Sequence, residues 1–215
     1  MDKKTELIER KARWSWYSYD FGNSAYASVV LLAVYSAFFK NVVVGGAEGT
    51  RLWGISVGIA AIIVALISPV LGTVADLTRS KKKFLFLFTG MSATFTALLF
   101  FVGKGDVLAG MVLFILAEVG YRAAQVLYDS LLVEVSTPET VGSVSGKGWA
   151  TGMMGGVVAL LLVLLPIQLI GNEMIPLAFL MTAALYLIFS IPTFLWVKEK
   201  HDQENTPIKE NPILL

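Results

Sequence analysis

Four polar or ionisable residues recur at helical spacing in and just after an apolar segment, residues 107–128. They are Glu118, Arg122, Gln125 and Asp129, at positions i, i+4, i+7 and i+11. At about 100° per residue, this spacing places all four on one narrow stripe of a helix. Glu118 stands 11 residues after Val107, which corresponds to about 16 Å of helix rise. The stripe therefore reaches the middle of the apolar segment.

Ionisable side chains at that depth in a membrane cost several kcal/mol unless they pair with one another or face water. A glutamate four residues before an arginine is the favourable order for a pair within one helix. Two interpretations follow for Glu118 and Arg122. Either the pair only locks two helices together, or it belongs to the wall of a polar cavity. In the second case, Glu118 would carry a proton and Arg122 would serve as its counter-charge or bind an anion.

A second polar cluster opens an earlier apolar segment. Asp20, Asn23 and Ser24 share one face of a predicted helix. Asp20 is explained either by the favourable interaction of an acid with a helix N-terminus or by a role in a cavity. Together with the stripe, these residues give the predicted substrate or coupling path: Asp20, Asn23, Glu118, Arg122, Gln125 and Asp129.

Six apolar stretches must position these residues. They lie near residues 21–39, 52–73, 84–103, 107–128, 149–170 and 174–197. Crossing a bilayer core of ~30 Å takes ~20 helical residues, and the backbone in lipid must satisfy its own hydrogen bonds. The sequence therefore predicts an all-α membrane protein with six transmembrane helices. The third and sixth stretches contain no charged residue, and we expect them to face lipid.

The distribution of positive charge orients these spans. With the N-terminus in the cytoplasm, 13 of the 17 Lys and Arg residues lie on the cytoplasmic side, 3 lie outside, and Arg122 lies within a span. This bias follows the positive-inside rule and predicts that both termini are cytoplasmic. We divide the chain into a cytoplasmic leader at residues 1–13, a transmembrane bundle at residues 14–197 and a polar cytoplasmic tail at residues 198–215.

Composition argues against several kinds of chemistry. The sequence contains no cysteine, and its single histidine, His201, lies in the polar tail. Cysteine–metal sites and a serine–histidine pair within the membrane are thus excluded. We expect no enzymatic activity, no catalytic residue, no metal and no cofactor. The basic runs act as topology signals rather than nucleic-acid patches, since no aromatic residues alternate with them.

Glycines recur every four residues in the fifth span, at Gly148, Gly152 and Gly156, and in the second span at Gly54 and Gly58. Such rows let another helix approach closely. The contact made by the fifth span lies either within the bundle or between two copies of the chain.

The end of the second span resembles the cytoplasmic loop motif of the major facilitator superfamily. Gly72 is followed by Asp76 and then by Arg79 and Lys81. The resemblance identifies these four residues as a gating motif, in which a close glycine contact, an acid and cations hold the inner gate. Arg79 and Ser80 depart from the family, which usually has glycine and then arginine at these positions.

Two further stretches resemble the branch of that superfamily named for the fungal vacuolar amino-acid effluxer. One is WYSYDFGNSAY at residues 16–26, and the other runs from YDSLLVE at residues 128–134 through VSGKGWA at residues 144–150. Asp129, Val133 and Ser143 depart from the pattern. The resemblance covers residues 14–197.

This resemblance implies the N-terminal half of a fold with twelve spans, whose substrate site lies between two six-helix halves. The expected function is that of a half-size secondary transporter that moves a small polar solute, with amino acids and protons as candidates, and requires a second half. Three explanations account for a single half: a natural half-transporter that pairs with another copy or with a separate chain, a truncated gene, or a fragment. The alternative is a non-transporting or degenerate membrane subunit with an assembly or regulatory role. We expect a multi-pass protein of a bacterial inner membrane.

Overall fold

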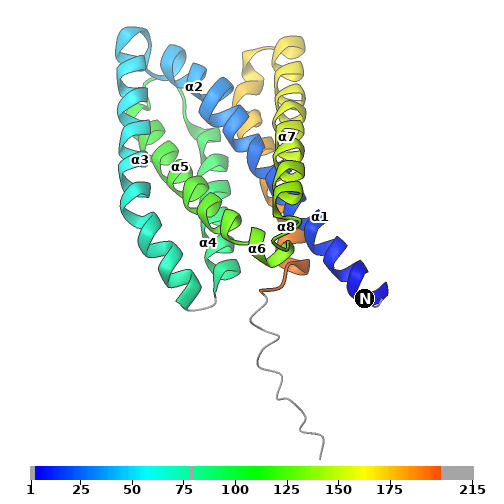
Figure 1. Ribbon diagram of the computed structural model, residues 1–215. Helices are drawn as coiled ribbons and strands as arrows, with labels where there is room; N and C mark the ends of the chain where they lie inside the picture. Colours follow the sequence, from blue (N-terminus) through cyan, green and yellow to red (C-terminus); the bar gives the residue numbers. More distant parts are fainter. Residues whose placement is uncertain (1–2, 78–79, 200–215) are drawn as a thin grey trace, which may run out of the picture.

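The computed structural model describes residues 3–77 and 80–199, and within these ranges every regular element is a helix (Figure 1). Six helical segments are long and apolar enough to cross a membrane. The predictions of an all-α fold and of six transmembrane helices are confirmed. The spans are Glu6–Val44, Gly46–Ala75, Lys81–Phe101, Val107–Val135, Val141–Ile170 and Asn172–Trp196.

The first span is interrupted by two wider π-helical turns. It consists of α1 (Lys3–Tyr26), η1 (Ala27–Ala33), α2 (Val34–Phe38) and η2 (Phe39–Val44). The other elements are α3 (Gly46–Leu77), α4 (Lys81–Leu98), η3 (Leu99–Phe101), α5 (Val107–Ser130), α6 (Leu132–Val135), α7 (Val141–Ile170), η4 (Asn172–Met174) and α8 (Ile175–Trp196). Because α1 begins at Lys3, the charged leader is helical from that residue and continues directly into the span.

The first two spans are longer than predicted, and only a tight turn separates them. Gly45 and Gly46 have φ angles of +88° and +61°. This left-handed region is open to glycine at little cost, whereas other residues are strained there. The apolar stretches alone did not reveal where these two helices begin and end, because the helices continue through the polar residues on both sides of this turn.

By sequence, spans one to three and spans four to six form two three-helix units, and the packing exchanges the first helices of these units. The first span, α1, packs mainly against α7 and α8, which are the fifth and sixth spans. The fourth span, α5, packs mainly against α3 and α4, which are the second and third. Contact between α4 and α8 joins the two groups. Each unit therefore contributes its leading helix to the other, as expected of a half built from two related three-helix repeats.

The least packed spans are α3 and α7, not the third and sixth spans that we expected to face lipid. In the most apolar window of α3 only 11% of residues are buried, against 33% in α4 and in α8. The helices α4 and α8 bury small polar residues against their neighbours. Because these residues carry no charge, the absence of charge in the two spans did not reveal that they pack against other helices. The small polar residues are Thr89, Ser92, Thr96, Thr182, Ser190 and Thr193.

An aromatic cluster fixes α1 against α5. The Tyr128 ring stacks between Trp16 and Tyr19, with ring centroids 4.5 Å and 4.9 Å away. The Tyr19 hydroxyl lies 2.7 Å from the Thr89 hydroxyl and 2.9 Å from that of Tyr186. Four helices thus meet through buried rings whose polar ends are mostly satisfied.

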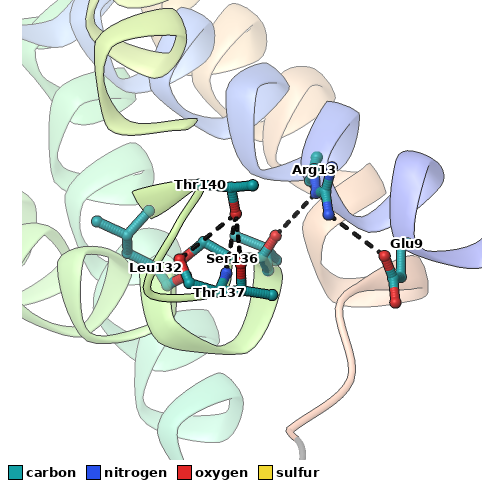
Figure 2. Close-up of polar contacts among 7 residues, drawn as sticks. Glu9, Arg13, Leu132, Ser136, Thr137 and Thr140 are labelled. Atoms are coloured by element: carbon teal, nitrogen blue, oxygen red, sulfur yellow. Dashed lines mark hydrogen bonds and ion pairs between the residues drawn. The ribbon is translucent and has the colours of Figure 1, made fainter. Parts of the chain in front are cut away.

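Both ends of the described chain lie at one end of the bundle (Figure 1). There, Arg13 of α1 donates from Nε to the carbonyl oxygen of Val135 at 3.1 Å and pairs with Glu9 at 3.3 Å. Figure 2 shows this link, together with the turn in which Thr137 and Thr140 bond to each other. The short helix α6, at the end of the fourth span, is therefore tied to the first span.

Candidate functional site

The predicted stripe forms one side of α5, and its two charged members form a pair. Arg122 donates from Nε to Glu118 Oε1 at 2.8 Å. The Glu118 side chain is only 3% exposed, whereas that of Arg122 is 47% exposed. The pair therefore links a buried acid to a guanidinium group at the surface of this bundle. Removing charged groups from water costs several kcal/mol per ion, which such a pair recovers only in part.

The second carboxylate oxygen of Glu118 does not take part in the bond to Arg122. Glu118 Oε2 and the Tyr26 hydroxyl are both buried and lie near each other, but neither has a hydrogen-bond partner of good geometry among the described residues. The two groups interact electrostatically, and the Tyr26 ring stacks on Tyr121 at 4.7 Å. Buried polar atoms of this kind call for an explanation, such as a proton, a water molecule or a ligand. Sequence reasoning did not select Tyr26 as a site residue, although it ends the motif at residues 16–26, because a tyrosine in an apolar span is usually a packing residue.

Two amides bridge the first and fourth spans. Asn23 donates from Nδ2 to Gln125 Oε1 at 2.8 Å, and Gln125 donates from Nε2 to Asp129 Oδ1 at 3.2 Å. Asn23 is buried, while Asp129 is exposed. The structure therefore brings Asn23 of the first predicted cluster into the stripe on α5.

Asp20 lies one helical turn before Asn23. Its carboxylate interacts electrostatically with Asp129 and packs closely against α7 at Gly152. No ion pair or hydrogen bond of Asp20 is found among residues 3–77 and 80–199. Asp20, Asn23, Gln125 and Asp129 thus form one polar face across α1 and α5, and Glu118 and Arg122 continue it along α5.

The glycine row of the fifth span faces α1. A Cβ atom added at Gly148 would overlap the Trp16 ring, and one added at Gly156 would overlap the Ser28 hydroxyl. At Gly152, an added Cβ atom would lie 2.6 Å from Asp20 Oδ2. Gly155, which lies outside that periodic row, comes against the backbone carbonyl of Phe21.

The second-span glycines behave differently. A Cβ at Gly54 or Gly58 would have no described atom within 4 Å. The expectation of a close helix contact at these two positions is therefore wrong within this chain. They lie on the poorly packed α3, where four-residue spacing alone could not say which side of the helix faced the bundle.

The predicted gating motif is visible only in part. The Asp76 side chain and Arg79 lie outside the described residues, and Gly72 makes no close contact. Lys81 Nζ lies 3.5 Å from Glu134 Oε1, and both side chains are largely buried. This ion pair joins α4 to α6. Sequence reasoning did not select Glu134 as a site residue, although it ends the motif at residues 128–134.

The polar face lies between the two least packed helices. In Figure 1, α5 runs between α3 and α7, with α1 crossing beside it. Large apolar side chains are exposed on both flanking helices, among them Ile62 and Leu66 on α3 and Met153 and Leu161 on α7. Six apolar spans, with ionisable residues gathered on one face of the bundle, define the class: an integral, multi-pass, all-α membrane protein.

Known proteins with similar sequences agree with this class. The family model described as vacuole effluxer Atg22 like matches residues 52–140. The chain is 32% identical over 210 residues to the "Uncharacterized MFS-type transporter YxiO" of Bacillus subtilis (strain 168), covering 92% of this chain and 48% of the relative. It is 23% identical over 192 residues to an "Uncharacterized protein" of Aquifex aeolicus (strain VF5), covering 89% and 47%. No solved structure matches the chain.

These findings confirm the predicted resemblance to one half of a major facilitator superfamily transporter. The chain spans about half the length of the curated relatives it matches. The matched family and the Bacillus relative are named as an effluxer and a transporter, not as enzymes, in agreement with the prediction that this chain is not an enzyme.

Proposed function

We propose that this chain is the N-terminal six-helix half of a secondary transporter, which moves a small polar solute by alternating access against a second six-helix half. One observation carries the proposal. A membrane-spanning helix presents ionisable residues from buried Glu118 to exposed Asp129 along a single stripe, and the Arg122 side chain is 47% exposed. Such groups cost several kcal/mol against lipid. This face therefore requires a second polar surface.

The length of the relatives and the packing support the same proposal. The matched relatives are about twice as long as the aligned chain, and the Bacillus relative is named as a transporter. The exchanged three-helix units are the arrangement found in each half of such transporters. A second half over α5 would turn the polar face into one wall of a central cavity near the bilayer midplane. It would come from another copy of this chain, from a separate chain or from the continuation of a longer protein.

The residues of the polar face would then have different tasks. Arg122 would bind an anionic group of the solute, and Asn23 and Gln125 would offer amide hydrogen bonds. Buried Glu118, with one oxygen unpartnered, is the group that we propose to carry a coupling proton. Its pairing with Arg122 would change when that proton binds.

The proposed gate lies at the end of the bundle that carries both ends of the described chain. It contains Lys81 together with the motif residues Gly72, Asp76 and Arg79. The Lys81–Glu134 pair holds α4 to α6, so it would open or reform as this half rocks. We propose that this end faces the cytoplasm of a bacterial cell, with both termini inside, because the positive charge is concentrated there.

Two measurements test the proposal. Mild detergent extraction followed by native mass measurement should give about twice the 23.4 kDa chain mass, or a complex with a second chain of similar size. Proteoliposomes containing that assembly should take up labelled amino acids from a mixture. Glu118→Gln should abolish the dependence of uptake on a proton gradient.

A different outcome would identify a non-transporting subunit. The chain would then be a folded monomer in lipid nanodiscs, and exposed Asp129 would react with a membrane-soluble carbodiimide because no second half covers it. If that assembly also failed to move any solute of the mixture, the transport proposal would be rejected.

A further inference from the structure

We propose that the polar face selects a solute with an anionic group and a cationic group at opposite ends of an extended chain, as in a dibasic amino acid. Arg122 would bind the anionic end, and Asp20 and Asp129 would receive the cationic end. This inference rests on the proposed transport function and adds the substrate class to it.

The anionic end is assigned to Arg122 because its guanidinium group is only partly used. Its one hydrogen bond among the described residues runs from Nε to Glu118, and almost half of the side chain is exposed. The two terminal nitrogens are therefore available to a ligand. Two parallel N–H groups of a guanidinium match the two oxygens of a carboxylate in position and charge.

The cationic end is assigned from the balance of charge. Glu118 and Arg122 neutralise each other, whereas neither Asp20 nor Asp129 forms an ion pair in the described part of the chain. The two carboxylates nevertheless lie close enough to interact with each other. A face with two uncompensated acids within membrane-spanning helices favours a bound cation.

The Tyr128 hydroxyl independently points to a ligand at the same place. It is buried without a hydrogen-bond partner and interacts electrostatically with both Asp20 and Asp129. Its ring is held between Trp16 and Tyr19, which fixes the position of the oxygen. A bound ammonium group carries three N–H donors, and these match two carboxylates and one phenolic oxygen.

The distance between the two ends determines the kind of solute. Arg122 and Asp129 are seven residues apart on the uninterrupted helix α5, which corresponds to about 10 Å along the axis. Between them, Asn23 and Gln125 are hydrogen-bonded to each other and carry no charge. The carboxylate and ammonium of an ordinary α-amino acid share one carbon atom and cannot reach both ends. A side chain that ends in an ammonium group can.

The test uses ligands that each lack one end of the molecule. The purified chain of 215 residues, with any partner that co-purifies, is placed in lipid nanodiscs, and binding is measured by calorimetry. The probes are lysine, norleucine, which lacks the terminal ammonium, and 1,5-diaminopentane, which lacks the carboxylate. Lysine should bind at least about tenfold more tightly than either of the other two, because each charged hydrogen-bonded contact contributes at least that factor.

Two variants should remove one preference each. Asp129→Asn should abolish the preference for lysine over norleucine and leave norleucine affinity unchanged. The double variant Glu118→Gln/Arg122→Gln, which leaves no buried unpaired charge, should abolish the preference for lysine over 1,5-diaminopentane. Asp106→Asn provides a matched control, because Asp106 precedes α5 far from the polar face and its amide oxygen can still accept the bond from Gly103.

Equal binding of lysine and norleucine, or no binding of any probe, would overturn this inference. So would a loss of lysine affinity in Asp106→Asn equal to that in Asp129→Asn. Failure here is distinguishable from failure of the transport proposal, because the mass of the assembly and uptake from the amino-acid mixture are measured without reference to lysine. Uptake of a neutral amino acid alone would refute the substrate class and leave transport intact.

Discussion

Replacing Arg122 by glutamine should destabilise the protein more than replacing Glu118. The two side chains are joined at 2.8 Å, but they differ in exposure, at 47% for Arg122 and 3% for Glu118. After Arg122→Gln, a buried carboxylate remains without a partner. After Glu118→Gln, the guanidinium group keeps access to the surface and a glutamine oxygen remains beside it.

The magnitude follows from these two environments. At an effective dielectric constant near 20, the charges attract by ~6 kcal/mol at this distance, and desolvation offsets much of this attraction. We expect Arg122→Gln to lower the free energy of unfolding by about 3 kcal/mol, at the low end of losses for a broken buried pair because Arg122 is half exposed. Glu118→Gln should cost about 1 kcal/mol, and the double variant about the same. The resulting coupling energy is about 3 kcal/mol.

Reversible unfolding in mixed micelles of a mild detergent and dodecyl sulfate, followed by tryptophan fluorescence, measures all four proteins under one condition. Additive losses in the double variant would refute the reasoning, because they would mean that the two side chains do not interact. A larger loss for Glu118→Gln than for Arg122→Gln would refute the assigned burial.

Three further outcomes are expected. Gly155→Ala should lower the free energy of unfolding by about 1–3 kcal/mol, because the added methyl group overlaps the backbone of α1; thermal unfolding measures this loss. Arg13→Gln should increase hydrogen exchange in α6, since it removes the bond to the Val135 carbonyl. Single cysteines placed at exposed Lys83 and Glu139 of this cysteine-free chain should react with an impermeant thiol reagent only after the cells are opened.

Each of these outcomes has a matched control. Gly146→Ala lies on the same helix, where a Cβ meets nothing within 4 Å, and should be neutral or slightly stabilising. Arg10→Gln removes a nearby leader cation that makes no described hydrogen bond, and α6 exchange should not change. A cysteine at exposed Lys104 should label in intact cells. Labelling of position 83 or 139 from outside, or equal effects of the two glycine changes, would contradict the orientation or the packing described above.

Periodicity predicted the stripe on α5 and hydropathy predicted the six spans, because both depend only on residues near one another in sequence. The bond between Asn23 and Gln125 depends instead on the way α1 approaches α5, and it joins residues 102 positions apart. No local pattern determines that approach. Glycine spacing was equally ambiguous: it predicted a close helix contact both at Gly152, which lies against Asp20, and at Gly54, where this chain makes none. The pairing of Lys81 with Glu134 likewise required the position of α6.

The exchange of leading helices between the two three-helix units has a consequence for the timing of biosynthesis. The Thr193 hydroxyl donates to the carbonyl oxygen of Ser15, and the Ser18 hydroxyl to that of Phe189, across 178 and 171 residues of sequence. At typical rates of synthesis, roughly 10 to 35 s separate the appearance of these partners. The first span, which carries Asp20 and Asn23, must therefore wait in the insertion machinery or the bilayer until the last span arrives. Premature release of the first span would expose its polar residues to lipid before α7 and α8 exist to cover them.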